Sequence, residues 1–130
     1  MTQDKKSISS KYISIFSVEN FINAFQNTND IKCNGILLVM PFGIVYGKFQ
    51  SIDVENPKTL GNVLLSSNSK CKQSYIDDNY ELKGDGSQIL LKDAVVKYPT
   101  GITLNIDEII IFSDQVCGYY PVDLDAFYQT

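Results

Sequence analysis

The sequence predicts a mainly β protein, in which one short N-terminal helix precedes a strongly bent, antiparallel small barrel of five strands. Two stretches, residues 33–53 and 88–121, carry the apolar runs and tight turns that are typical of connected strands. A polar stretch rich in Gly, Ser, Asn and Asp separates them at residues 54–87. We expect residues 1–130 to form a single domain, because a chain of this length can bury a core of its own.

The N-terminal part contains one amphipathic segment. Residues 1–11 are polar and are expected to form a flexible arm, with a short extended segment at residues 12–16. Ser17 suits the N-cap of a helix over residues 17–27, because its hydroxyl can accept a bond from an unpaired backbone N–H. The apolar residues that recur at helical spacing are Val18, Phe21, Ile22 and Phe25. A helix this short is unstable alone, so we expect it to dock on the open end of the barrel.

The first barrel segment, residues 33–53, has the pattern of a bent hairpin. The apolar run at residues 35–40 is typical of a buried strand. Pro41 and Gly43 suit the tight turn that follows it. Gly47 lies in the middle of the returning strand, where a glycine often marks the bulge or sharp bend that a small barrel needs in order to close.

The insertion, at about residues 54–88, is expected to form a hairpin or a long loop. Residues 60–66 and 75–82 could pair as strands around the polar run at residues 66–69. Its acidic residues include Asp77, Asp78, Glu81 and Asp85. Their spacing does not match the twelve-residue calcium loop with its fixed Gly and terminal Glu, so a solvated acidic loop is the expectation.

The second barrel segment, residues 88–121, contains the last three expected strands. These strands are residues 89–96, 102–112 and 116–120. A Pro-Thr-Gly turn at residues 99–101 and a very short link at residues 113–115 connect them. The tail at residues 122–130 carries apolar side chains that could pack back on the domain or touch a neighbouring chain.

The composition argues against catalysis. The chain has no His, no Arg and no Trp, and its 11 positive charges are all Lys. Without His, the usual acid–base group near neutral pH is missing, as are His-based triads and His-ligated metal sites. No P-loop or dinucleotide fingerprint occurs, and Asp107 and Glu108 would point to opposite faces of a strand. We therefore expect no enzyme, no cofactor and no bound metal.

The cysteines and the hydropathy pattern indicate a reducing, cytoplasmic setting. Cys33, Cys71 and Cys117 are odd in number and form no CxxC pair, so we expect neither a disulfide framework nor a thiolate zinc site. Cys33 and Cys117 fall in strand-like runs, where a free cysteine usually packs as a small buried residue. No apolar run approaches the roughly 18 residues of a membrane helix, and the N-terminus lacks the apolar core of a signal peptide. We therefore expect no membrane partner.

Two segments carry a resemblance to a known family. Residues 47–53 (GKFQSID) combine a Gly, an apolar residue and an Asp at characteristic spacing. Residues 109–120 (IIIFSDQVCGYY) form an apolar strand, a tight turn and another apolar strand. Together with the order of the elements, these segments resemble the Sm-like small β-barrels, the family of the Sm, LSm and Hfq proteins. Barrels of the SH3 or OB type share much of the same pattern.

The resemblance implies a homo-oligomeric ring, in which the fourth strand of one subunit pairs with the fifth strand of the next. Such a ring consumes the strand edges that would otherwise be exposed. The expected interface residues are Ile109, Ile110, Ile111, Phe112, Val116, Cys117 and Tyr119.

The same resemblance implies contacts with RNA or another oligonucleotide. Asp53 matches the acidic residue of the family's third loop, and Asn56 lies one position early for the family's Asn. The residues that could contact bases are Asp53, Asn56, Ser113 and Gln115. The aromatic residues that could stack on bases or pack in the core are Phe42, Tyr46, Tyr119 and Tyr120. The net charge of −4, the absence of Arg and the acidic Asp114, where the family has a basic residue, disfavour RNA. RNA binding and protein scaffolding both stay open, and the alternative is a monomeric small-barrel interaction module.

Overall fold

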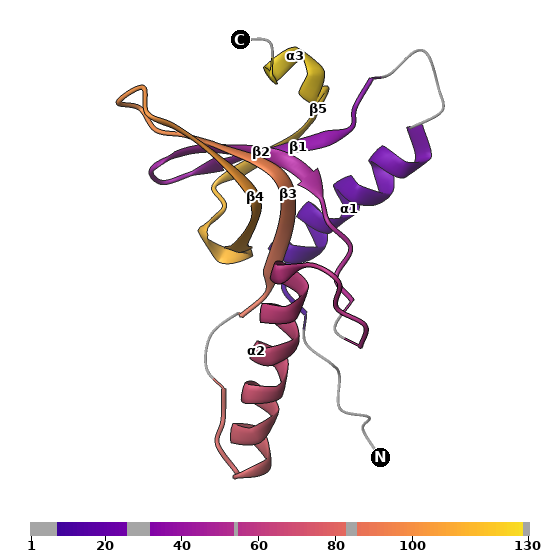
Figure 1. Ribbon diagram of the computed structural model, residues 1–130, viewed down its shortest axis with the longest axis vertical. Coiled ribbons are helices and arrows are strands. Elements are labelled where there is room, and N and C mark those ends of the chain that lie inside the picture. The colour runs from indigo at the N-terminus through magenta and orange to yellow at the C-terminus, as the bar shows by residue number, and fades with distance from the viewer. Residues whose placement is uncertain (1–7, 26–31, 54, 83–85, 129–130) are drawn as a thin grey trace.

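The computed structural model describes residues 8–25, 32–53, 55–82 and 86–128 (Figure 1). Its elements are α1 (Ser10–Phe25), β1 (Gly35–Met40), β2 (Gly43–Phe49), α2 (Leu60–Asp77), β3 (Gln88–Lys97), β4 (Thr103–Phe112), the 3-10 helix η1 (Ser113–Gln115), β5 (Gly118–Val122) and α3 (Leu124–Tyr128). The expected N-terminal helix and five strands are therefore confirmed.

The five strands form one antiparallel sheet in the order β4-β3-β2-β1-β5. Strands that follow one another in the sequence lie side by side from β1 to β4, and β5 returns to the free side of β1. β4 and β5 are thus the two outer strands. Within the described residues no ladder joins β4 to β5, so the structure confirms an antiparallel sheet without showing its closure into a barrel.

The sheet bends sharply where β2 crosses β3. The pairing of these strands shifts register between Tyr46 and Lys48, on either side of Gly47. A Cβ atom on Gly47 would lie 2.9 Å from the backbone oxygen of Lys92, so this close approach requires glycine. The next residue of β3, Asp93, has a left-handed φ of 50°. The expectation that Gly47 marks a bulge or bend is therefore confirmed.

Helices pack on both faces of the sheet. On one face, Ile15, Val18 and Ile22 of α1 are buried in the main core. The strands and the β4–β5 link contribute Ile36, Leu38, Met40, Val45, Ile89, Leu91, Ala94, Val96, Ile111 and Val116 to that core. A smaller core on the other face joins Tyr46 and Val95 of the sheet to Leu124 of α3. The sheet is therefore held by contacts between residues far apart in the sequence.

Helix α1 begins earlier than the sequence indicated. The Ser9 hydroxyl accepts a bond from the Tyr12 backbone N–H at 3.1 Å, and the helix starts at Ser10. The expected extended segment at residues 12–16 is therefore wrong, and Ile15 within it is fully buried. Ser17 is not an N-cap, because it lies inside the helix and its hydroxyl donates to the Ser14 carbonyl oxygen at 2.6 Å. The expected last helical residues, 26 and 27, lie outside the described residues.

The insertion is a helix and not a hairpin. α2 covers 18 residues and includes the polar run that suggested a break between two strands. Thr59 caps it, because its side chain accepts a bond from the Asn62 backbone N–H at 3.2 Å. Figure 1 shows α2 projecting away from the sheet. None of the helices in the described parts of the chain is long and apolar enough to cross a membrane.

The tail packs back on the domain. Leu124 is fully buried, and its backbone N–H donates to Asn34 Oδ1 at 2.7 Å. The rings of Phe127 and Tyr46 lie 5.2 Å apart between their centroids. A side chain on Gly35 would collide with Leu124, so α3 and β1 approach closely at this point. Of the two options left open for the tail, the structure shows intrachain packing.

The three cysteines are free thiols in different environments. Cys33 is half-buried and packs against the main core, as expected. Cys117 is exposed, so the expectation that it is a buried packing residue is wrong. The reason is that residues 116–117 form the link into β5, where Val116 alone points into the core.

Candidate functional site

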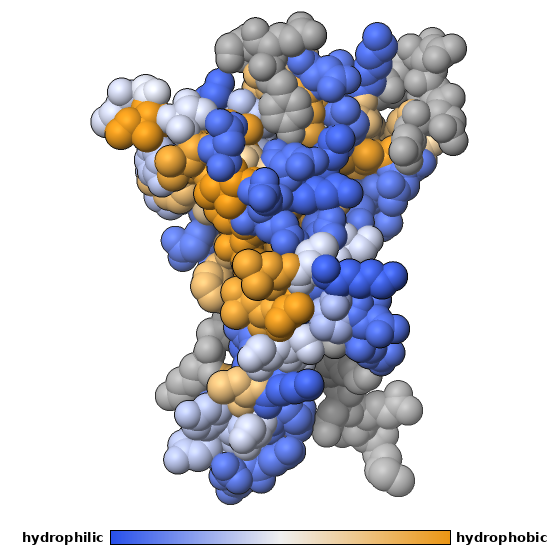
Figure 2. All heavy atoms as spheres, in the orientation of Figure 1, coloured by the Kyte–Doolittle hydropathy of each residue, from blue (hydrophilic) through white to orange (hydrophobic). Residues whose placement is uncertain are grey.

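The two edge strands of the sheet, β4 and β5, expose apolar side chains, and we call these two edges the margins of the sheet. Leu104 and Phe112 on β4 and Tyr119 and Tyr120 on β5 are exposed. Figure 2 shows an apolar patch that runs over β4 and the first turns of α2. This patch borders a groove of about 600 Å³ whose apolar walls include Leu60, Leu64, Ile106 and Ile110. Such uncovered strand margins invite pairing with another chain.

The hydrogen bonds show which backbone groups of β4 point outward. The Gln50 backbone N–H donates to the Leu90 oxygen at 3.0 Å, so Leu90 directs its peptide groups toward β2. The Ser113 N–H donates to the Ser87 oxygen at 2.9 Å, which places that pair in the β3–β4 ladder. In an antiparallel pair, two facing residues either both point their N–H and C=O groups toward each other or both point them away. Since Leu90 points its groups away from β4, its partner Ile110 points its N–H and C=O away from β3.

The expected interface residues divide into two groups. Ile111 and Val116 are buried in the chain's own main core, so they are not available to a partner. Ile111 pairs with Ile89, and both side chains belong to the core beneath α1. The other expected residues are half-buried or exposed, and these are Ile109, Ile110, Phe112, Cys117 and Tyr119.

The expected RNA-contacting residues are not joined into one site. Ser113 is fully buried, and its hydroxyl donates to the Ser87 oxygen at 3.2 Å, so the expectation that it contacts a base is wrong. Asp53 closes its own loop, because its Oδ1 accepts from the backbone N–H of Asn56 at 3.0 Å and of Glu55 at 3.2 Å. Asn56 lies exposed in that loop, and Gln115 lies exposed in η1.

The aromatic residues proposed for stacking also differ from one another. Tyr46 is buried between Phe127 and Lys97, whose Nζ lies 5.6 Å from the ring centroid, so it cannot stack on a base. Phe42 is partly exposed and packs on Tyr98 with the ring centroids 5.5 Å apart. Of these four aromatic residues, Tyr119 and Tyr120 have exposed rings on β5, at the edge of the sheet.

The N-terminal end of α2, which we call its root, is held by a buried side chain that the sequence analysis did not identify. Asn62 is almost fully buried, and its Oδ1 accepts from the Asp53 N–H at 2.8 Å. Its Nδ2 donates to the Ser51 oxygen at 2.9 Å and to Thr59 Oγ1 at 3.1 Å. Asn62 therefore ties the loop after β2 to the first turn of α2. Thr59, a residue type that favours the N-cap position of a helix, was the signal available in the sequence.

A carboxylate from β4 completes this root. Glu108 Oε1 accepts from the Gly61 backbone N–H at 3.1 Å, at the N-terminus of α2 where a negative charge is favoured. Its Oε2 is buried and has no hydrogen-bond partner within the described residues. A Cβ on Gly61 would lie 2.8 Å from this oxygen, so a larger residue here would require the Glu108 side chain to shift.

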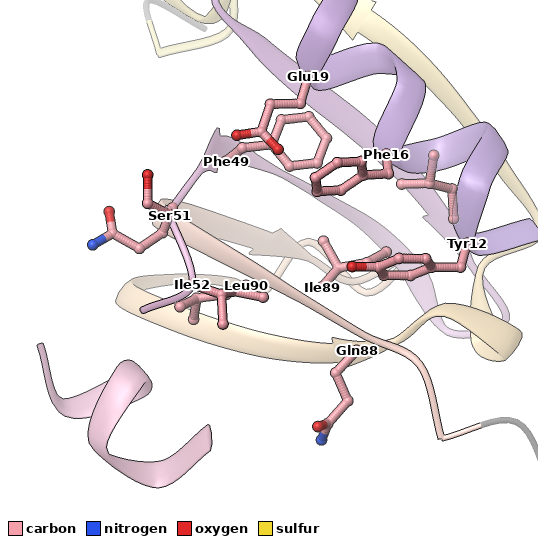
Figure 3. A pocket seen from close by; sticks show the side chains of 11 residues that line it. Tyr12, Phe16, Glu19, Phe49, Ser51, Ile52, Gln88, Ile89 and Leu90 are labelled. Carbon is pink, nitrogen blue, oxygen red and sulfur yellow. The ribbon is translucent and has the colours of Figure 1, made fainter. Parts of the chain in front are cut away.

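A pocket of about 400 Å³ lies between α1 and the adjoining ends of β2 and β3. Three aromatic rings, Tyr12, Phe16 and Phe49, line it together with Ile89 and Leu90 (Figure 3). Its polar rim comes from Gln50, Ser51 and Gln88. Glu19 is the one charged residue in the wall, and burial raises the pKa of its carboxyl above the usual 4.5. This pocket was not expected, because its walls come from segments that are distant in the sequence.

Comparison of the sequence with known proteins does not assign it to a family. No protein-family model matches the sequence, and a search of the curated proteins found no significant match. The Sm-like resemblance therefore depends on residues 47–53 and 109–120 and on the order of the elements.

Proposed function

We propose that this chain is a non-enzymatic scaffolding protein that assembles with copies of itself, edge to edge, through β4 and β5. The observation that carries the proposal is the pair of open, apolar margins at the two ends of one sheet. Pairing β4 of one copy with β5 of the next would continue the sheet and satisfy outward groups such as those of Ile110. It would also cover Phe112 and Tyr119, which are exposed in the single chain.

The use of two different margins determines the kind of assembly. A contact between unlike surfaces is heterologous, so it closes into a ring when the rotation between copies allows and otherwise forms a filament. The sharp bend at Gly47 and Asp93 supports a ring, because it turns each copy relative to the plane of its neighbour. In this proposal each copy acts as one small barrel of an Sm-like ring.

Scaffolding is better supported than RNA binding as the role of such a ring. Ser113 is occupied inside the chain, and Asp53 is engaged by its own loop. The exposed Asp114 in η1 would repel a phosphate, and the net charge of −4 acts in the same direction. The surface left for a partner is apolar and aromatic, which suits protein contacts.

Sedimentation velocity on the wild-type chain tests the proposal. We expect one species with several times the mass of the 14.6 kDa chain. Phe112→Lys on β4 and Tyr119→Lys on β5 should each lower this mass, because a charge on a strand margin opposes pairing. The matched control, Tyr80→Lys, changes an aromatic residue that is more exposed than Phe112 or Tyr119 and lies outside both margins, and it should assemble normally.

Mixing the two margin variants identifies the pairing. Each variant keeps one intact margin, so a heterologous β4–β5 contact predicts a two-chain complex in the mixture but not in either variant alone. A β4–β4 contact would instead give dimers of Tyr119→Lys by itself. A wild-type monomer at micromolar concentration would overturn the proposal in favour of a monomeric interaction module. Binding of oligo-uridine or oligo-adenine by the wild-type assembly would overturn the scaffolding role in favour of RNA binding.

A further inference from the structure

The pocket beneath α1 combines a hydrophobic lining with one negative charge. Its volume of about 400 Å³ lies within the range of small-molecule sites. The rings of Tyr12, Phe16 and Phe49 form much of its wall. Figure 3 shows the Tyr12 hydroxyl directed into the pocket and the Glu19 side chain reaching down from α1. The pocket belongs neither to the sheet margins nor to the loops that were expected to contact RNA.

The charge of Glu19 is not neutralised by the protein. Within the described residues its carboxylate forms no hydrogen bond or ion pair, and burial raises the pKa of this group. Lys48 and Lys92 line a neighbouring hollow together with Glu19 and Phe49. Neither lysine forms an ion pair with Glu19, so the carboxylate can accept a cation from the pocket side. A half-buried carboxylate without a partner loses part of its hydration, and a bound cation would offset this loss.

We propose that the pocket binds a small organic cation, namely an ammonium group carried on a flat, aromatic body. The ammonium group would donate charge-assisted hydrogen bonds to the Glu19 carboxylate. The aromatic body would lie among Phe16, Phe49 and Tyr12, whose ring faces also attract positive charge. An anionic ligand is disfavoured, because it would meet Glu19 in a partly dehydrated site.

Isothermal titration calorimetry with two matched probes tests this assignment. Phenethylamine carries the ammonium group, and 2-phenylethanol has the same shape without the charge. At neutral pH we expect phenethylamine to bind the wild-type chain about tenfold more tightly than 2-phenylethanol, as one charge-assisted hydrogen bond implies. Glu19→Gln should remove this preference, and the exposed control Glu55→Gln should keep it. Amide shifts of α1 and β2 residues should map the bound probe to the pocket.

A pH titration gives a second measurement that needs no variant. Phenethylamine should bind more weakly as the pH falls and Glu19 gains a proton, since the acid form loses its charge. The other ionisable groups that face the site are Tyr12, Lys48 and Lys92. Equal binding of the two probes, unchanged binding by Glu19→Gln, or no binding of phenethylamine up to its solubility limit would each overturn the assignment.

Discussion

The sheet and helix α2 are built in contrasting ways. In the sheet, fully buried residues such as Leu38 and Leu91 belong to the main core beneath α1, and every strand pairs with a partner. In α2, the buried residues, such as Asn62 and Leu65, lie in the first two turns. Its outer turns expose Tyr75 and Ile76. The sheet is therefore stabilised by a hydrophobic core to which several elements contribute, and α2 by a few polar contacts at its N-terminal end.

The largest expected difference between the two regions comes from removing buried volume. Leu38→Ala should lower the free energy of unfolding by about 2–5 kcal/mol, because Leu38 is fully buried and its loss leaves a cavity. Ile76→Ala on the outer part of α2 should change it by less than about 0.5 kcal/mol. Urea unfolding followed by circular dichroism compares the two variants. Equal losses would mean that α2 shares the core of the sheet.

The bend in the sheet should be the next most sensitive feature. Gly47→Ala should cost about 1–3 kcal/mol, because the new methyl group would press on the Lys92 backbone oxygen. Gly118→Ala in β5 is a matched control, since its Cβ would meet Val39 at an ordinary 3.7 Å. Thermal unfolding of both variants measures the difference. A neutral Gly47→Ala would show that the strands can separate at the bend without loss.

The root of α2 should respond locally. Asn62→Ala removes the partner of the Asp53 N–H and of the Ser51 oxygen, and we expect a cost of about 1–2 kcal/mol. Hydrogen exchange should show faster exchange in α2 and unchanged protection in β1 to β3. Asn68→Ala, in the middle of the same helix, should not speed exchange. Loss of protection throughout the sheet would contradict the separation of the two regions.

The smallest effect should come from Glu19, between α1 and the sheet. Its pKa is raised in the folded chain, so the folded state holds the proton more tightly than the unfolded state does. The free energy of unfolding should therefore fall as the pH rises from the usual 4.5 through the raised pKa. Glu19→Gln should remove this fall, so its stability relative to wild type should increase between about pH 3 and 7. If the difference in the free energy of unfolding between Glu19→Gln and wild type is the same at both ends of this pH range, the prediction is contradicted.

The strand pattern was predictable because local and long-range requirements agree there. The local conformational preferences of the apolar run of β1, the turn at Pro41 and the glycine of β2 agree with the conformations that these segments have in the sheet. In α2 the same kind of reasoning failed. Its Ser- and Asn-rich sequence has weak helix propensity, and part of its stabilisation comes from Glu108, which lies 47 residues away from Gly61 in the chain.

The candidate sites divide in the same way. The apolar character of residues 109–112 could be read directly, but the burial of Ile111 depends on which strand face α1 covers. Ser113 looked like a loop residue available to a ligand, and the close approach of Ser87 makes it part of the interior. The pocket around Glu19 had no signature in the sequence, because its walls meet only when α1 docks on β2 and β3.

The amino-acid sequence by itself determined the five strands, the bend at Gly47 and the absence of histidine chemistry, since each follows from residue type and spacing. The tertiary structure decided where α1 begins, that the insertion is helical, which apolar residues face outward and that Glu19 lies in the wall of a pocket. These depend on contacts between distant segments, and local preference is too weak to specify them.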